Sequence, residues 1–173
     1  GGITFGLKHV FGDQVHCFFV EPTHSPAVLI GLVTGEHEKV NVQDFGIDNR
    51  TEADGLAVGT PSSFTTEISE KLVSGIYTIK DDELFKILVL LMESEGLKVE
   101  PSAASGLQGP IQLQQQSDYI ESHGLTKYMA QATHIAWATG GLLVPKEDME
   151  RFYAKGKKIL DEKDTDGNPF GFN

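Results

Sequence analysis

Apolar and polar positions follow two patterns along the chain, one typical of helices and one typical of buried strands. Residues 3–11 place apolar side chains on one helical face, and residues 81–95 combine an acidic first turn with an apolar stripe and a following glycine. Residues 15–21 and 133–139 are short, apolar and rich in β-branched and aromatic side chains. We therefore expect two helices and two buried strands in these ranges.

Weaker versions of both patterns occur along most of the remaining chain. A helix is predicted over residues 25–35, with Ser25 as its N-cap and Pro26 at its first position. Ser63 and Glu67 suggest a capping box for a helix within residues 62–74. Further helices are predicted at 101–116 and 145–160, short strands at 76–79 and 97–100, and a structured loop at 41–61.

The alternation of strands and helices predicts the fold class. It favours an α/β domain with a mostly parallel sheet flanked by helices. In such sheets, ligands bind beyond the carboxyl ends of the strands. Three unusual loops directly follow predicted strands, at residues 21–26, 100–106 and 138–141. We expect these loops to converge on one site.

Composition narrows the classes of partner. The chain has 173 residues and a net charge of −11, which argues against binding a nucleic-acid backbone. No apolar run approaches the roughly 20 residues that span a bilayer, so no membrane association is expected. Cys17 is the single cysteine and lies within a predicted strand. We expect it to be a buried apolar side chain in a protein of the reducing cytoplasm.

Four short motifs carry candidate chemistry, and each has a purely structural alternative. Gly1 and Gly2 open a predicted helix, as the end of a phosphate-binding loop would, although a cleaved tag leaves the same residues. Glu21 ends a strand before a turn with free carbonyls, where it could bind a hard cation or remain a solvated carboxylate. Gly55 permits close approach of a ligand or simply forms a tight turn, and Thr139 supplies a hydroxyl or simply ends a strand.

Together and in this order, the motifs resemble a known family. The stretches "FGLK", "VHCFF", "EPTHSP", "ADGLAVG", "VEPSAASG" and "THIAWATGG" are similar to the C-terminal part of the D-serine dehydratase family. That family belongs to the fold type II enzymes that use pyridoxal 5′-phosphate (PLP), together with tryptophan synthase β. The resemblance covers residues 1–158 and implies an N-terminally incomplete large, PLP-binding domain. Residues 159–173 fall outside it and are expected to form a loose polar tail.

The resemblance implies roles for five residues at the cofactor. Gly1 and Gly2 match the last two positions of the phosphate loop, and Gly55 matches the glycine that lies against the cofactor edge. Thr139 matches the residue that hydrogen-bonds the pyridine nitrogen, and Gly140 leaves room beside it for a flat ring. The Schiff-base lysine of the family lies upstream of the matched region. No catalytic residue is therefore assigned in this chain, and we expect the chain alone to be inactive.

The resemblance also implies a cation site. Glu21 matches a glutamate that coordinates a structural cation in related enzymes, with the carbonyl of Ser25 as its companion. Ala27 stands where serine racemase has a further acidic ligand. The loss of that carboxylate favours potassium over a tightly bound divalent ion.

The implied activity of the intact protein is α,β-elimination, in which D-serine is converted to pyruvate and ammonia. The expected partner is this small-molecule substrate, and the intact enzyme is expected to be a cytoplasmic monomer. Two alternatives stay open: a serine or threonine dehydratase of other stereospecificity, and a non-catalytic α/β domain that binds a small molecule. A lysine in a cofactor-binding context upstream would favour the enzymes.

Overall fold

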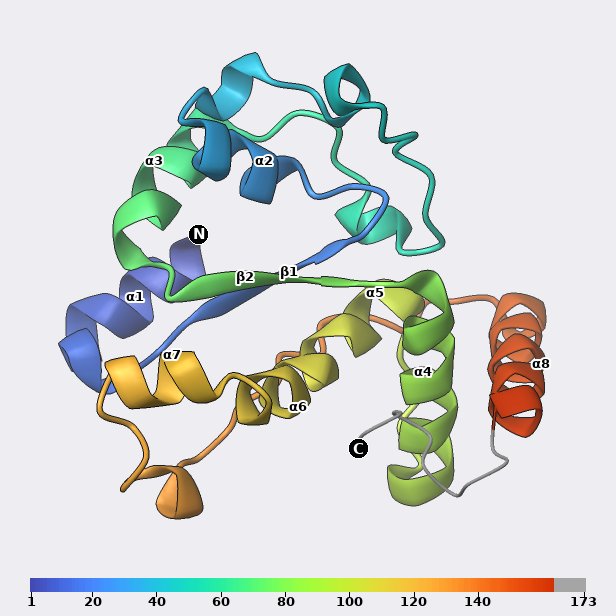
Figure 1. Cartoon of the computed structure of the whole chain (residues 1–173). Coiled ribbons are helices and arrows are strands. Elements are labelled where there is room, and N and C mark those ends of the chain that lie inside the picture. Colours follow the sequence, from blue (N-terminus) through green and yellow to red (C-terminus); the bar gives the residue numbers. More distant parts are fainter. Residues whose placement is uncertain (164–173) are drawn as a thin grey trace. The chain divides into compact units, whose positions relative to one another are not determined.

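The computed structural model describes residues 1–163 and divides the chain into two compact units. Unit 1 is Gly1–Asp81, and unit 2 begins at Asp82 (Figure 1). Helix α8 ends at Lys163, so the first residues of the predicted tail 159–173 are helical. The remainder of that tail lies outside the described residues.

Unit 1 contains a small parallel sheet and three helices. Its elements are α1 (Gly2–Phe11), β1 (Phe18–Pro22), α2 (Ala27–Thr34), α3 (Ser63–Leu72) and β2 (Gly75–Ile79). The long connection from α2 to α3 is a structured loop, as predicted, with 3-10 turns at His37–Lys39, Val42–Phe45 and Asp54–Leu56. Each helix and strand lies close to its predicted range.

The two strands pair in parallel, with Phe18 opposite Gly75 and Pro22 opposite Ile79. A side chain at Gly75 would crowd the Phe18 ring, which lies 3.1 Å from the place a Cβ would occupy. Cys17 precedes β1, is 9% exposed, and donates its backbone N–H to the Ser74 hydroxyl. The pairing confirms a parallel α/β arrangement and the buried setting of Cys17.

Unit 2 is helical in its regular elements. After α4 (Asp81–Glu95), which starts at the unit boundary, come α5 (Pro101–Ala104), α6 (Gln108–Gln114), α7 (Ser117–Ser122) and α8 (Lys146–Lys163). Helix α4 is the core of the unit, because Leu84, Phe85 and Leu88 are fully buried. Its apolar stripe and the glycine after it were predicted, and Gly96 adopts the expected left-handed conformation with φ of 68°.

Helices α4 and α8 pack closely because α8 carries a glycine at their contact. A Cβ at Gly156 would meet the Phe85 carbonyl oxygen and would lie 2.6 Å from Cγ2 of Val89. The rings of Phe85 and Phe152 pack 5.9 Å apart, and the Lys155 ammonium lies 4.2 Å from the Phe85 ring centre. The contact therefore depends on a small residue at one position.

Two predicted strands are absent. Residues 97–100 and 133–139 have no strand partner among the described residues, and Ile135 and Trp137 are 74% and 56% exposed. The prediction of a buried strand at 133–139 was therefore wrong for this chain. An apolar segment becomes a strand only when another strand satisfies its backbone groups. Among the described residues, the Glu100 N–H bonds to the carbonyl of Gly140, just beyond the second segment, and no backbone bond joins 97–100 to 133–139 itself.

The predicted helix caps were also wrong. Helix α2 has Pro26 at its N-cap, because the Ser25 hydroxyl is used elsewhere. Helix α3 begins after Ser62, without a side-chain cap. Ser63 and Glu67 are four residues apart, whereas a capping box needs a spacing of three.

Within residues 1–163, every helix is too short or too polar to cross a bilayer.

Replacing Gly156 by alanine should destabilise unit 2. The added methyl group has no room at the Phe85 carbonyl, so we expect a loss of about 1–3 kcal/mol from overpacking, reduced in part by the better helix propensity of alanine. Gly6→Ala is the matched control, because Gly6 lies within α1 and has open space around it. That control should be neutral or stabilising by up to about 1 kcal/mol. Urea unfolding measures both, and equal effects would contradict the packing argument.

The contact between Glu93 and α8 should make stability depend on pH. The hydrogen bond from Tyr153 (2.7 Å), and then Lys157, hold the pKa of Glu93 below its ordinary value. Its contribution is therefore present at and above the ordinary pKa and is lost as the pH falls through the lowered pKa. Tyr153→Phe should raise the Glu93 pKa, as followed by NMR titration. Tyr128→Phe, at an exposed tyrosine, should leave it unchanged.

Candidate functional site

The loop after β1 is organised by the Glu21 carboxylate. Its two oxygens accept the backbone N–H groups of Val28 and Leu29, at 2.8 and 2.9 Å, so that Glu21 caps the first turn of α2. Glu21 is 8% exposed, and this burial raises the pKa of its carboxyl against the two hydrogen bonds, which lower it. The role of Glu21 as a cation ligand stays a prediction; the structure shows that both oxygens of its carboxylate bond to the start of α2.

Ser25 joins three stretches of unit 1. It is fully buried, and its hydroxyl lies 2.6 Å from Oδ1 of Asn49 and 2.9 Å from the carbonyl of Val58. The neighbouring His24 contacts Asp48 through Nδ1 at 2.7 Å, and this hydrogen bond lowers the pKa of Asp48. The Glu21 loop is thereby tied to the loop that contains Gly55.

Gly55 lies in the 3-10 turn Asp54–Leu56, three residues before Val58. It is exposed, and its N–H is held by the Asp54 carboxylate at 2.8 Å. The predicted positions Glu21, Ser25 and Gly55 are thus connected through one hydrogen-bonded loop cluster.

The N-terminus of α1 offers the other predicted contact in unit 1. Gly1 is its N-cap, and the Gly1 carbonyl accepts the Phe5 N–H at 2.9 Å. A Cβ at Gly2 would meet nothing within 4 Å. The first-turn N–H groups of a helix attract phosphate, and the glycines leave their approach open. The geometry of this end fits a phosphate group.

In unit 2, Thr139 and Gly140 lie beside a residue that the sequence analysis missed. A Cβ at Gly140 would be 2.5 Å from Oε1 of Glu100, so the carboxylate lies directly over the glycine. The next residue, Gly141, has φ of +142° and packs against the backbone of Lys98 and Val99. Thr139 itself is exposed. The Thr139 hydroxyl precedes this glycine pair, the Glu100 carboxylate lies against Gly140, and the backbone at Gly141 requires glycine.

A repeated motif could have revealed Glu100. Valine, glutamate and proline occur together twice, at residues 20–22 and 99–101, and each glutamate ends a predicted strand. Of the three loops expected to converge, 100–106 and 138–141 do meet, because Glu100 lies against Gly140; Gly106 lies against the backbone of Trp137, just before the second loop. The third loop, 21–26, belongs to unit 1.

Among residues 1–163, no cluster of three or more histidine, cysteine, aspartate or glutamate side chains is positioned to bind a metal ion. A cation beside Glu21 would therefore need backbone and hydroxyl oxygens as its other ligands. Rings of backbone carbonyls are typical ligands of potassium.

Comparison with known proteins shows which family this chain resembles. The pyridoxal-phosphate dependent enzyme family matches residues 1–123. Probable D-serine dehydratases from Geobacillus stearothermophilus and Pseudomonas aeruginosa (strain UCBPP-PA14) are 54% and 52% identical to this chain, over 92% and 93% of its length. The chain spans only 35% and 36% of those two relatives.

Solved structures share the fold at lower identity. The processed form of threonine deaminase isoform 2 from Solanum lycopersicum has a TM-score of 0.60 at 16% identity, over 91% of this chain and 38% of that protein. The serine racemase of Dictyostelium discoideum has a TM-score of 0.55 at 22% identity, over 83% of this chain and 40% of that protein. These structures confirm the fold class expected from the sequence. The chain belongs to the pyridoxal-phosphate dependent enzyme family.

Proposed function

We propose that this chain is part of a PLP-dependent lyase that converts D-serine to pyruvate and ammonia. The observation that carries the proposal is the identity of about half of all residues, across nine-tenths of the chain, to probable D-serine dehydratases. The threonine deaminase and serine racemase structures are too distant in sequence to favour their own substrates. Water is lost across Cα and Cβ of serine, and water is taken up again when the released enamine is hydrolysed, so the atoms balance.

The cofactor, when bound, supplies the electron sink that allows the α-proton to leave. The chain's own residues would bind the cofactor and orient its ring. The first-turn N–H groups of α1, beside Gly1 and Gly2, would hold the phosphate, and the backbone at Gly55 would lie at the edge of the ring. Thr139 would donate its hydroxyl to the pyridine nitrogen, and Gly140 would leave room for the ring face. A carboxylate, that of Glu100, lies next to this position.

None of these residues removes or returns the α-proton, so we assign no catalytic residue to this chain. Pyruvate formation from D-serine by the chain alone, with PLP added, would contradict that assignment. The reaction itself is tested with a full-length protein that contains this chain. Pyruvate should form from D-serine much faster than from L-serine, and 2-oxobutyrate should form only slowly from L-threonine. A preference for either L-amino acid would overturn the proposed substrate.

Thr139 should tune the cofactor. A neutral hydroxyl donates to an unprotonated ring nitrogen, whereas a carboxylate would favour the protonated ring. In the full-length enzyme, Thr139→Ala should weaken PLP retention by the equivalent of about 1 kcal/mol. Thr139→Asp should raise transamination relative to pyruvate formation. Thr133→Ala, at the other end of the same segment, is the control and should change neither the dissociation constant for PLP nor the product ratio.

Potassium should act through the Glu21 loop. We expect potassium, compared with lithium at equal ionic strength, to raise both the thermal midpoint and the activity of the full-length enzyme. Glu21→Gln should abolish that difference. Because Glu21 also caps α2, the variant should lose about 1 kcal/mol of stability in either salt, so the difference between salts is the diagnostic quantity. Glu38→Gln, at an exposed carboxylate, serves as control. A potassium response that persists in Glu21→Gln would leave the residue with a capping role only.

A further inference from the structure

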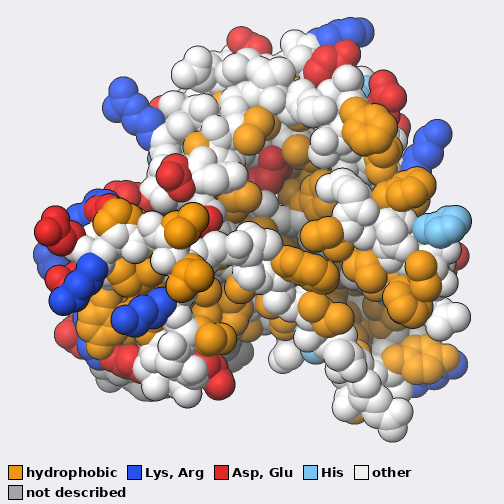
Figure 2. All heavy atoms as spheres, turned by 180° about the vertical axis from the view of Figure 1, so that it is seen from behind, with side chains coloured by type: hydrophobic (Ala, Val, Ile, Leu, Met, Phe, Trp, Pro, Cys, Tyr) orange, Lys and Arg blue, Asp and Glu red, His pale blue; other side chains and the backbone are white. Residues whose placement is uncertain are grey.

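Asp81 lies where β2 leads into α4. It follows Ile79, the last residue of β2, by two positions, and it is the first residue of α4. Acidic side chains occur at many places on the face that Figure 2 shows, and the chain has 25 of them, so a carboxylate alone indicates no role. Asp81 is of interest because both of its carboxylate oxygens bind the loop that leads to Gly55.

The Asp81 carboxylate holds the chain just before the 3-10 turn Asp54–Leu56. The Thr51 hydroxyl donates to Oδ1 at 2.5 Å, and the Glu52 N–H donates to Oδ2 at 2.7 Å. The Thr51 oxygen in turn accepts the N–H of Ala53 at 3.1 Å, and Ala53 is fully buried. Hydrogen bonds to an ionised carboxylate are shorter and stronger than those between neutral groups. The residues that lead into the turn are therefore fixed by a single side chain.

The chain after the turn is held from the end of the other strand. Ser25, in the loop after β1, donates its hydroxyl toward Oδ1 of Asn49 at 2.6 Å and toward the Val58 carbonyl at 2.9 Å. Strands β1 and β2 pair with each other, so the two anchors share one base. The turn is thus held on both sides, by Asp81 before it and by Ser25 after it.

We infer that Asp81 is a positioning residue for the cofactor contact at Gly55. The inference rests on the proposed function, in which the Gly55 backbone lies at the edge of the ring. A backbone contact has no side chain that can adjust, so its position depends on the residues that fix the loop. Loops are the more mobile parts of a fold, and a turn held only by Ser25 would be free to move at its other end. Asp81 acts through Thr51 and Glu52, and we assign it no contact with the cofactor.

The first test is hydrogen exchange in a full-length protein that contains this chain, with no PLP added. Asp81→Asn leaves one acceptor oxygen for two donors, so we expect exchange at residues 53–58 to accelerate about tenfold. Asp82→Asn is the matched control, because the exposed Asp82 carries the same charge in the same first turn of α4. It reproduces the change in net charge and in the interaction with the helix dipole, and it should leave exchange at residues 53–58 unchanged.

The second test is PLP retention by the same full-length protein. A shift of the turn moves the Gly55 backbone away from the ring, so Asp81→Asn should raise the dissociation constant for PLP about tenfold. Thr51→Val keeps the shape of the side chain and removes its hydroxyl, and it should act in the same direction. Thr51→Ser keeps the hydroxyl and should retain PLP as the wild type does.

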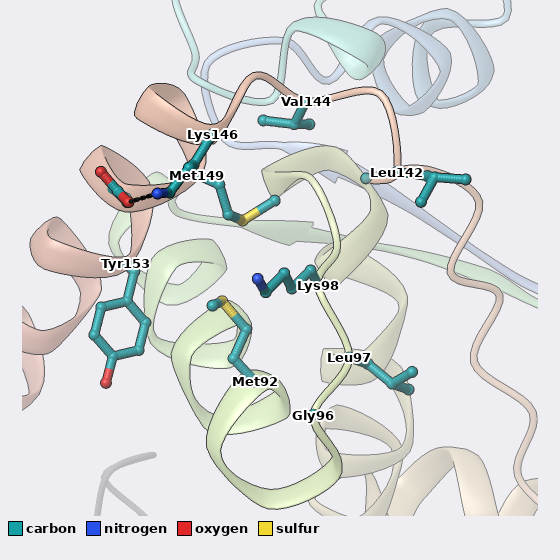
Figure 3. A pocket seen from close by; sticks show the side chains of 11 residues that line it. Met92, Gly96, Leu97, Lys98, Leu142, Val144, Lys146, Met149 and Tyr153 are labelled. Atoms are coloured by element: carbon teal, nitrogen blue, oxygen red, sulfur yellow. Dashed lines mark ion pairs between the residues drawn. The ribbon is translucent and has the colours of Figure 1, made fainter.

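A variant that lowers stability elsewhere separates positioning from a purely structural role. Met149 of α8 is 7% exposed and lines a cavity of about 620 Å³ in unit 2, together with Met92 of α4 (Figure 3). Removing a buried side chain destabilises a protein, so Met149→Ala should lower the thermal midpoint. It should change neither the exchange at residues 53–58 nor the dissociation constant for PLP.

Four outcomes would overturn the inference: unchanged exchange at residues 53–58 in Asp81→Asn, equal acceleration in Asp82→Asn, faster exchange without weaker PLP retention, or equal loss of PLP in Met149→Ala. Circular dichroism checks that the variants fold; if Asp81→Asn does not, the comparison of Thr51→Val with Thr51→Ser decides. The proposed function fails separately. PLP retention that depends on Asp81, in a full-length protein that does not convert D-serine, would sink the proposed activity and leave the positioning role intact.

Discussion

A buried carboxylate holds together the part of unit 1 in which ligand chemistry is expected. Glu21 stands where β1 ends and binds the first free N–H groups of α2, at 2.8 and 2.9 Å. These N–H groups lack partners within the helix, so an acceptor must come from elsewhere. Because the acceptor belongs to the end of the strand, the direction of α2 and the path of the loop between them follow from this contact. Ser25, inside that loop, then ties in the stretch around Gly55.

Unit 2 repeats the Val-Glu-Pro motif of β1 at residues 99–101, but the glutamate makes different contacts. Glu100 also follows a valine and precedes a proline, and its backbone carbonyl accepts the N–H groups of Ala103 and Ala104 at the start of α5. Its side chain is directed at Gly140 instead of a helix terminus. The two glutamates show how one local pattern leads to two different environments. In unit 1 the Glu21 carboxylate caps a helix. In unit 2 the Glu100 carboxylate lies next to Gly140, the position proposed for the cofactor ring.

Sequence reasoning succeeded where local signals decide. Helices α1, α4 and α8 have apolar faces at helical spacing, and β1 and β2 are apolar stretches that pair with one another inside the chain. It failed where the outcome depends on distant residues. Residues 133–139 have the composition of a strand, but pairing requires a partner. Ser25 has the right residue type for a cap, yet its hydroxyl bonds to Asn49, 24 positions away. Glu100 was missed because its neighbour Gly140 lies 40 residues further on.

The single cysteine gives unit 1 an internal reporter. Cys17 is buried at the entrance to β1, and its backbone is tied on both sides to Ser74, just before β2. A thiol reagent can reach it only when this end of the strand pair opens. The rate of labelling therefore reports the free energy of a local opening, separately from the global unfolding that denaturants measure. Since no other cysteine competes for the reagent, ligands that tighten the loop cluster beyond β1 would be detected as slower labelling of one atom.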